Sequence, residues 1–228
     1  MIKNILIILS ISTLLVASPQ ILLVVSDAEN STRAKLFCYE GEKQIFHSIE
    51  VNLGKKGLGW GIGQKEFATT LVQKKEGDKK APAGVFALTH IFGYMADKNY
   101  KLPYIHANEK LICVDDSEDI DYNKIITKKD TVPKSYEEMR RDDTQYSLGI
   151  VVAHNQEGKK GMGSCIFIHV EKGKHEPSSG CTTLKYEELE KIVEWLDERK
   201  NPILIQITKE YLSEIKKLYP ALKEHKED

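Results

Sequence analysis

The sequence predicts a mostly β fold with helices late in the chain, an α+β arrangement. Short apolar runs bounded by turn residues recur between residues 20 and 170, a pattern typical of strands. A helical period first becomes clear after residue 186, where apolar residues recur at Leu189, Ile192, Val193 and Leu196. The 228 residues contain no repeat and no long linker, so we expect one domain after the N-terminal segment.

The first elements are three expected strands at residues 20–25, 34–39 and 44–53. The third alternates apolar and polar side chains, and turn-like segments separate all three. Four closely spaced glycines follow at Gly57, Gly59, Gly61 and Gly63. Their spacing fits neither a dinucleotide fingerprint nor a phosphate-binding loop, so it favours a bent or bulged strand.

The middle of the chain is polar. Residues 74–80 are highly charged, and we expect them to be exposed; residues 81–84 form an expected turn before a strand at 85–88. The acidic cluster at residues 115–121 is interpreted as a solvated turn. A calcium loop would need glycine where Ile120 stands, and a glycosidase carboxylate pair is the weaker reading. Ser135 and Glu138 fit a capping box, which predicts a short helix.

Two strands and the helical region complete the chain. Residues 146–154 alternate, with His154 on the apolar face, and residues 165–170 place Cys165, Phe167 and His169 on one face. A helix is expected from Tyr186 until Asn201 and Pro202 end it. A last strand at 203–207 and a short helix at 211–218 follow.

Charge and the N-terminus bear on location. Lys and Arg number 33 against 34 Asp and Glu, so the net charge of −1 gives no electrostatic case for nucleic acid as a partner. Residues 5–16 are a largely apolar run after Lys3, with small residues at Ala17 and Ser18. This layout predicts a signal peptide at 1–18, or an uncleaved anchor, before a domain at 19–228. We expect export and membrane contact only through this segment.

The four cysteines are Cys38, Cys113, Cys165 and Cys181. The chain contains no CxxC pair, so the pattern does not support thioredoxin chemistry or a ribbon-type zinc site. The first three lie in apolar runs and are interpreted as small strand residues, although two disulfides are possible. Cys181 differs because it follows a glycine in a turn.

His169 and Cys181 are the candidate base and nucleophile. His169 ends an apolar strand, and Cys181 ends the turn Ser178-Ser179-Gly180 ahead of a helix. An imidazolium and a helix N-terminus would both favour the thiolate, and lowering its pKa by ~2 units requires ~2.7 kcal/mol. Amides of Gly180 and Cys181 could face an oxyanion. Two alternatives are structural roles for both residues and a zinc site with His175, although no compact ligand pair anchors such a site.

The same segment resembles the L,D-transpeptidase (YkuD-type) catalytic domain family. The signature is a strand-end histidine followed by a Ser/Thr-x-Gly-Cys turn, matched by His169 and Ser178 to Cys181. The stretch from Ala81 to Phe86 resembles the family's T-P-x-G-x-F, and the blocks "EGDKKAPAGVFAL", "CVDD", "GIVVAHN" and "GSCIFIHV" resemble a subgroup. The resemblance implies a YkuD-like β-sandwich.

The resemblance also implies a thiol enzyme that acts on peptidoglycan stem peptides in the periplasm or cell envelope, without cofactor or metal. Cys181 would attack the carbonyl after the L-centre of diaminopimelate. His169 would act as the base, oriented by a backbone carbonyl. The thioacyl intermediate would pass to an amine or to water, so a carboxypeptidase or endopeptidase is the close alternative. A non-catalytic peptidoglycan-binding domain is the more distant one.

Three departures from the family pattern leave substrate recognition open. Val170 replaces the glycine after the histidine, Ser179 replaces the usual histidine before Gly-Cys, and the Arg or Asn common soon after the cysteine is missing from Thr182-Thr183. The candidate substrate-binding or oxyanion residues are Gly180, Ser179, Thr182, His154, Asn155 and Arg141. The candidates to bind the substrate carboxylate are Arg140, Arg141 and Thr182.

Overall fold

The computed structural model describes residues 18–64 and 69–226. Its main feature is a large mixed sheet in the strand order β1-β14-β6-β11-β12-β13-β4-β2-β3. β1 also pairs with β2, so the sheet closes on itself like a barrel. The predicted signal peptide lies, apart from Ser18, outside the described residues. No helix in the described ranges is long and apolar enough to cross a membrane.

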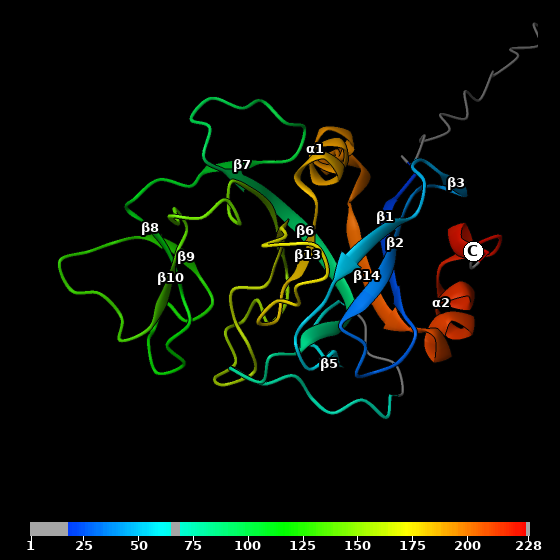
Figure 1. Cartoon of the computed structure of the whole chain (residues 1–228), viewed down its shortest axis with the longest axis horizontal. Helices are drawn as coiled ribbons and strands as arrows, with labels where there is room; N and C mark the ends of the chain where they lie inside the picture. Colours follow the sequence, from blue (N-terminus) through cyan, green and yellow to red (C-terminus); the bar gives the residue numbers. More distant parts are fainter. Residues whose placement is uncertain (1–17, 65–68, 227–228) are drawn as a thin grey trace, which may run out of the picture.

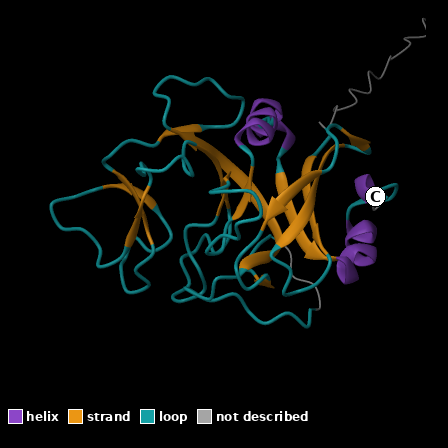
Figure 2. Ribbon diagram, in the orientation of Figure 1, coloured by secondary structure: helices purple, strands orange, loops and turns teal. Residues whose placement is uncertain are grey.

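Apart from the long strand β6, most strands of the large sheet are short, as are the helices, and long loops connect many of them (Figure 2). The strands are β1 (Gln20–Ser26), β2 (Arg33–Glu40), β3 (Lys43–Gln44), β4 (Ile49–Asn52), β5 (Leu58–Trp60), β6 (Ala81–Gly93), β7 (Tyr104–His106), β11 (Leu148–Val152), β12 (Phe167–Val170), β13 (Thr182–Leu184) and β14 (Ile203–Thr208). The helices are α1 (Tyr186–Trp195) and α2 (Leu212–Leu218), with 3-10 turns at Glu198–Lys200, Lys209–Tyr211 and Pro220–Leu222.

The apolar runs of the sequence form the hydrophobic core, which explains why they predicted strands and helices. All seven residues of β1 are buried: β2 and β14 pair with its two edges, and the apolar side chains of residues 21–25 belong to the main core cluster. Leu189, Ile192 and Val193 of α1 and Ile215 of α2 join the same core cluster. The predicted strands at 20–25, 34–39 and 203–207 and the predicted helices at the end of the chain are therefore confirmed. The mostly β fold is also confirmed, in a barrel-like form.

A second, three-stranded sheet lies on the side of the molecule opposite α2 (Figure 1). It consists of β8 (Leu111–Val114), β9 (Ile125–Thr127) and β10 (Tyr136–Glu138), in the order β10-β8-β9. The helix predicted from the capping box is therefore wrong. Residues 136–138 pair with β8, and the Glu138 carboxylate accepts a hydrogen bond from Lys128 Nζ at 2.5 Å.

One further prediction fails because of strand pairing, and another is confirmed only in part. The expected turn at 81–84 is the start of β6, because Ala81 to Ala83 pair with β5 and Gly84 pairs with Gln206 of β14. The expected strand at 44–53 is divided into β3 and β4, with irregular backbone between them. The glycine-rich segment contains β5, in agreement with the strand interpretation.

Candidate active site

The candidate nucleophile and base lie on neighbouring parallel strands. β12 and β13 pair with His169 opposite Thr183. Side chains two residues apart on a strand share a face, and paired residues of parallel strands point to the same side. The register therefore places Cys181, which immediately precedes β13, on the face that carries His169. Both residues line one cavity of about 600 Å³.

The turn before Cys181 is held by the Ser178 hydroxyl. Ser178 Oγ donates to the Cys181 carbonyl at 2.5 Å and accepts from the Gly180 amide at 3.0 Å. Gly180 has φ of +153°, and a Cβ there would lie 3.1 Å from the Lys80 carbonyl oxygen. Glycine is required at this position for both reasons. Because the Gly180 amide already donates to Ser178 Oγ, the Cys181 amide is the remaining candidate of the two expected oxyanion donors.

The sulfur of Cys181 is buried among backbone groups. The Phe167 amide donates to Sγ at 3.4 Å, and Sγ donates to the Cys165 carbonyl at 3.6 Å. Burial, followed by the nearby charge of Glu137, raises the pKa of Cys181 to about 12. The expected helix N-terminus does not oppose this rise, since β13 separates Cys181 from the start of α1 at Tyr186. The resting thiol is therefore neutral.

The imidazole of His169 is also neutral at rest. Its Nδ1 donates to the Val170 carbonyl at 2.9 Å, and its ring packs edge-on against Tyr146 with 4.9 Å between centroids. Burial lowers the pKa of His169 to about 4. With the proton on Nδ1, the other ring nitrogen carries the lone pair of a base. Among the described contacts, no hydrogen bond joins this ring to Cys181, so the resting site is not the expected thiolate–imidazolium pair.

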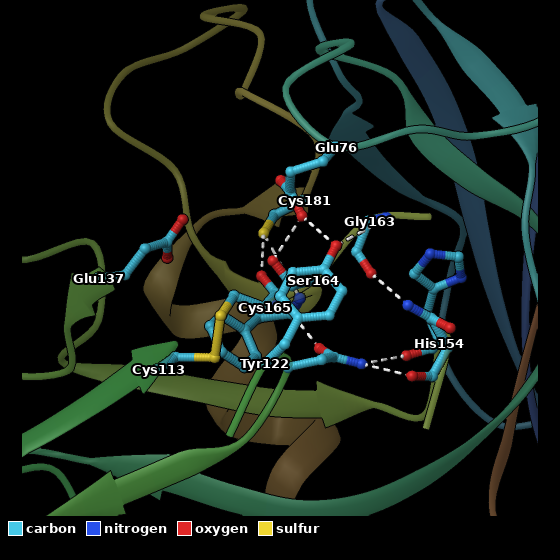
Figure 3. Close-up of a disulfide and its surroundings, with 12 residues drawn as sticks. Glu76, Cys113, Tyr122, Glu137, His154, Gly163, Ser164, Cys165 and Cys181 are labelled. Carbon is cyan, nitrogen blue, oxygen red and sulfur yellow. Dashed lines mark hydrogen bonds between the residues drawn. A yellow bond between two sulfur atoms is a disulfide. The ribbon is translucent and has the colours of Figure 1, made fainter. Parts of the chain in front are cut away.

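A disulfide connects the small sheet to this site. Cys113 of β8 is bonded to Cys165, which lies in the loop before β12. Cys113 is a strand residue, as expected, whereas Cys165 lies just before the strand expected to contain it, and the disulfide state that the sequence left open is a bond between these two residues. Cys165 has φ of +53°, and its amide donates to Asn123 Oδ1 at 2.9 Å. These constraints fix the carbonyl that contacts the Cys181 sulfur, beside the disulfide in Figure 3.

The small sheet also contributes acidic groups to the cavity wall. Glu137 of β10 pairs with Cys113, so its side chain shares the face of the disulfide. It accepts a hydrogen bond from the Tyr146 hydroxyl, and burial raises its pKa to about 6. Asp115 lines the same cavity, and its Oδ1 is buried without a hydrogen-bond partner among the described residues.

Three of the predicted substrate-binding residues line the cavity: Ser179, Gly180 and Arg141. The Arg141 guanidinium is occupied by Asp143, with Nε–Oδ1 at 3.0 Å and Nη2–Oδ2 at 2.8 Å. Arg140 lies elsewhere, with its guanidinium 4.3 Å from the centroid of the Tyr94 ring.

The other three predicted residues lie outside the cavity wall and hold backbone or core groups. Thr182 Oγ1 donates to Gln206 Oε1 at 2.7 Å, because Thr182 faces away from Cys181. His154 accepts from the Ile62 amide at 3.2 Å and, through Nε2, donates to the Met162 carbonyl at 3.0 Å. Asn155 donates to the carbonyls of Lys159 and Gly163, each at 3.0 Å.

Sequence reasoning missed several residues of the cavity wall. Thr183 is 2% exposed, and its Oγ1 has no hydrogen-bond partner among the described residues. The two-residue period from Cys181 could have indicated it. Lys74 was expected to be exposed, yet it is 3% exposed and lines the cavity. Its partner four residues on, Asp78, was the available signal.

The zinc alternative is not supported by the arrangement of its three residues. His175 is exposed, lies 3.4 Å from an Arg33 guanidinium nitrogen, and does not line the cavity of His169 and Cys181. Residues 18–64 and 69–226 contain no cluster of three or more side chains suited to a metal ion.

A free cysteine and a neutral histidine on adjacent strands of a β fold, in one cavity, define a candidate thiol-enzyme site. The family model of the L,D-transpeptidase catalytic domain, YkuD, matches residues 22–205. The chain therefore belongs to the L,D-transpeptidase catalytic domain family, whose members are enzymes that act on peptidoglycan peptides. No curated protein and no solved structure gives a significant match.

Proposed function

We propose that this protein is an exported cysteine enzyme that performs L,D-transpeptidation on peptidoglycan stem peptides. Cys181 is the nucleophile and His169 is the base. The observation that carries the proposal is that both side chains line one cavity, on the same face of β12 and β13. The Cys113–Cys165 disulfide supports export, since disulfides persist in oxidising compartments.

The first half-reaction forms a thioester. The sulfur attacks the stem-peptide carbonyl carbon while its proton passes to Nε2 of His169, because both groups are neutral at rest. The hydrogen bond from Nδ1 to the Val170 carbonyl keeps the basic nitrogen available and stabilises the imidazolium that forms. When the C–N bond breaks, His169 returns the proton to the leaving amine.

The second half-reaction transfers the acyl group. An acceptor amine attacks the thioester carbonyl and gives its proton to His169, the C–S bond breaks, and the proton returns to sulfur. The product is a new peptide bond. Water in place of the amine gives a free carboxylate, which is the carboxypeptidase or endopeptidase outcome. The amide of Cys181 is the proposed donor to the oxyanion in both halves.

The test is product analysis with purified muropeptides and mass spectrometry. The wild-type protein should form cross-linked dimers, and Cys181→Ala should form none. Cys38→Ala is a matched control, since Cys38 is the other free cysteine and is buried in the barrel core. Activity that persists in Cys181→Ala would refute the mechanism. Trimmed stems without dimers would identify the hydrolytic alternative.

A further inference from the structure

A buried lysine stands in the wall of the cavity next to the Cys181 turn. Lys74 is 3% exposed, and lysine is almost never this buried unless it is paired. A lysine at this depth is costly to keep charged, so its contacts need an explanation beyond solubility.

The ammonium of Lys74 is only partly occupied. Nζ donates to Asp78 Oδ1 at 2.7 Å and to the Lys75 carbonyl at 2.8 Å. An ammonium has three hydrogens, so one remains. Asp78 also accepts from the amides of Lys75 at 2.8 Å and Lys80 at 2.9 Å. Its negative charge is therefore shared among three donors and does not fully neutralise Lys74.

The position of Lys74 relates it to the reacting groups. A Cβ built on Gly180 would lie 3.9 Å from Lys74 Nζ, so the ammonium faces the backbone just before the nucleophile. Its positive charge also acts on Cys181, where it opposes the effect of burial on the pKa of the thiol.

The other cations of the cavity are poorer anion receptors. Asp143 holds two nitrogens of the Arg141 guanidinium. The Lys172 side chain is 70% exposed and pairs with Glu176 at 3.6 Å, and Lys55 is exposed. Exposed charges are screened by water and contribute little to binding. Lys74 is the buried cation in this wall of the described structure.

We propose that Lys74 binds the free carboxylate of the residue released from the stem peptide. This inference rests on the proposed function and names the recognition element of the same site. The remaining N–H of Nζ donates to the carboxylate beside Gly180, and Asp78 is a positioning residue that orients the ammonium. The site then selects peptides with an acid terminus over those with a neutral one.

The experiment compares a stem tetrapeptide bearing a free C-terminal carboxylate with the same peptide as a C-terminal amide. Wild-type kcat/KM should favour the acid by about 10- to 100-fold, as expected for one charge-assisted hydrogen bond. Lys74→Met should abolish that preference by raising KM for the acid far more than for the amide, whereas the loss of its charge near Cys181 affects both peptides alike. Lys74→Arg should retain part of the preference. The matched control is Lys75→Met, an exposed neighbour that contributes backbone groups.

Binding supplies a second measurement that does not depend on turnover. Cys181→Ala should bind the acid more tightly than the amide by calorimetry, and Cys181→Ala combined with Lys74→Met should bind both equally. If Lys74→Met fails to fold, the inference is tested by the acid-to-amide ratio of kcat/KM in the wild-type protein and in Lys74→Arg.

Equal wild-type activity on both peptides would overturn the inference alone. So would an equal loss on both in folded Lys74→Met, which would assign Lys74 to the oxyanion or to the structure. No turnover of either peptide would instead count against the proposed function, while the binding comparison still tests Lys74.

Discussion

The reactivity of Cys181 toward an alkylating reagent should depend steeply on pH. Burial and Glu137 raise the pKa of Cys181 from an ordinary value of 9.0 to about 12. A rise of this size corresponds to on the order of 4 kcal/mol and leaves roughly 1000-fold less thiolate at pH 7. Because only the thiolate reacts, alkylation of the unliganded protein should be slower than that of a free cysteine by a similar factor.

The assay is iodoacetamide labelling between pH 6 and pH 9, followed by peptide mass mapping of each cysteine. The rate at Cys181 should rise about tenfold per pH unit without a plateau, since the pKa of the group lies above this range. Cys38 provides an internal comparison, because burial raises the pKa of that thiol further. A plateau below pH 7 at Cys181 would show a thiolate–imidazolium pair and refute the neutral resting state.

The charge of Glu137 should also affect the alkylation rate of Cys181. Glu137→Gln removes a negative charge that raises the pKa of Cys181, so alkylation should accelerate. The effect should appear only above about pH 6, since Glu137 is protonated and neutral below its raised pKa. Glu138→Gln is the control, because the neighbouring carboxylate pairs with Lys128. Equal rates for Glu137→Gln and wild type at pH 8 would exclude this electrostatic coupling.

Three stability changes follow from the same region and are measurable by urea unfolding. Replacing Cys113 and Cys165 by serine should lower the free energy of unfolding by about 4 kcal/mol, from the chain-entropy relation for a loop of 52 residues; an unchanged midpoint would contradict it. Thr183→Val should raise that free energy by about 1 kcal/mol, since it removes a buried unpaired hydroxyl, and a loss would mean that the hydroxyl has a partner. Phe92→Ala should lower it by about 3–5 kcal/mol, because Phe92 is fully buried against Tyr146 and Phe167; a loss below 1 kcal/mol would be inconsistent with that packing.

The elements that could be predicted are those that are stabilised mainly by burial of their own apolar side chains. β1 and α1 bury apolar side chains at the period of their own secondary structure, so a local pattern revealed them. The candidate nucleophile and base could also be singled out, because a strand-end histidine and a Gly-Cys turn are local features; their catalytic roles stay predictions.

The failures share a different cause, which is pairing between distant segments. Ser135 and Glu138 carry a helix-start pattern, yet residues 136–138 form a strand because β8, more than 20 positions earlier, pairs with them. Ala83-Gly84 has turn chemistry, yet β5 and β14 enclose it. Long-range pairing overrides local preference, and a single sequence does not display it.

Lys74 illustrates the same limit at the site. The charge density of residues 74–80 favours exposure, and six of these seven residues are at least partly exposed. The exception is Lys74, whose ammonium group donates hydrogen bonds to Asp78 and to the Lys75 carbonyl and lies in the cavity wall. The Cys113–Cys165 pairing is similar, because four cysteines in a chain of this length leave several pairings open.

Cys113, Cys165 and Cys181 lie close together, so a non-native disulfide competes with the native one when the thiols are oxidised. The Cys181 sulfur lies 3.6 Å from the Cys165 carbonyl and is only 16 positions from that cysteine in sequence, against 52 for the native bond. Closing the shorter loop is easier by about 1 kcal/mol, so the unfolded chain favours a Cys165–Cys181 bridge, which would consume the proposed nucleophile. Either bridge leaves two free thiols, and a thiol titration would score both products alike. Only mapping of the disulfide-linked peptides distinguishes protein that has the Cys113–Cys165 bond from protein that has a Cys165–Cys181 bond.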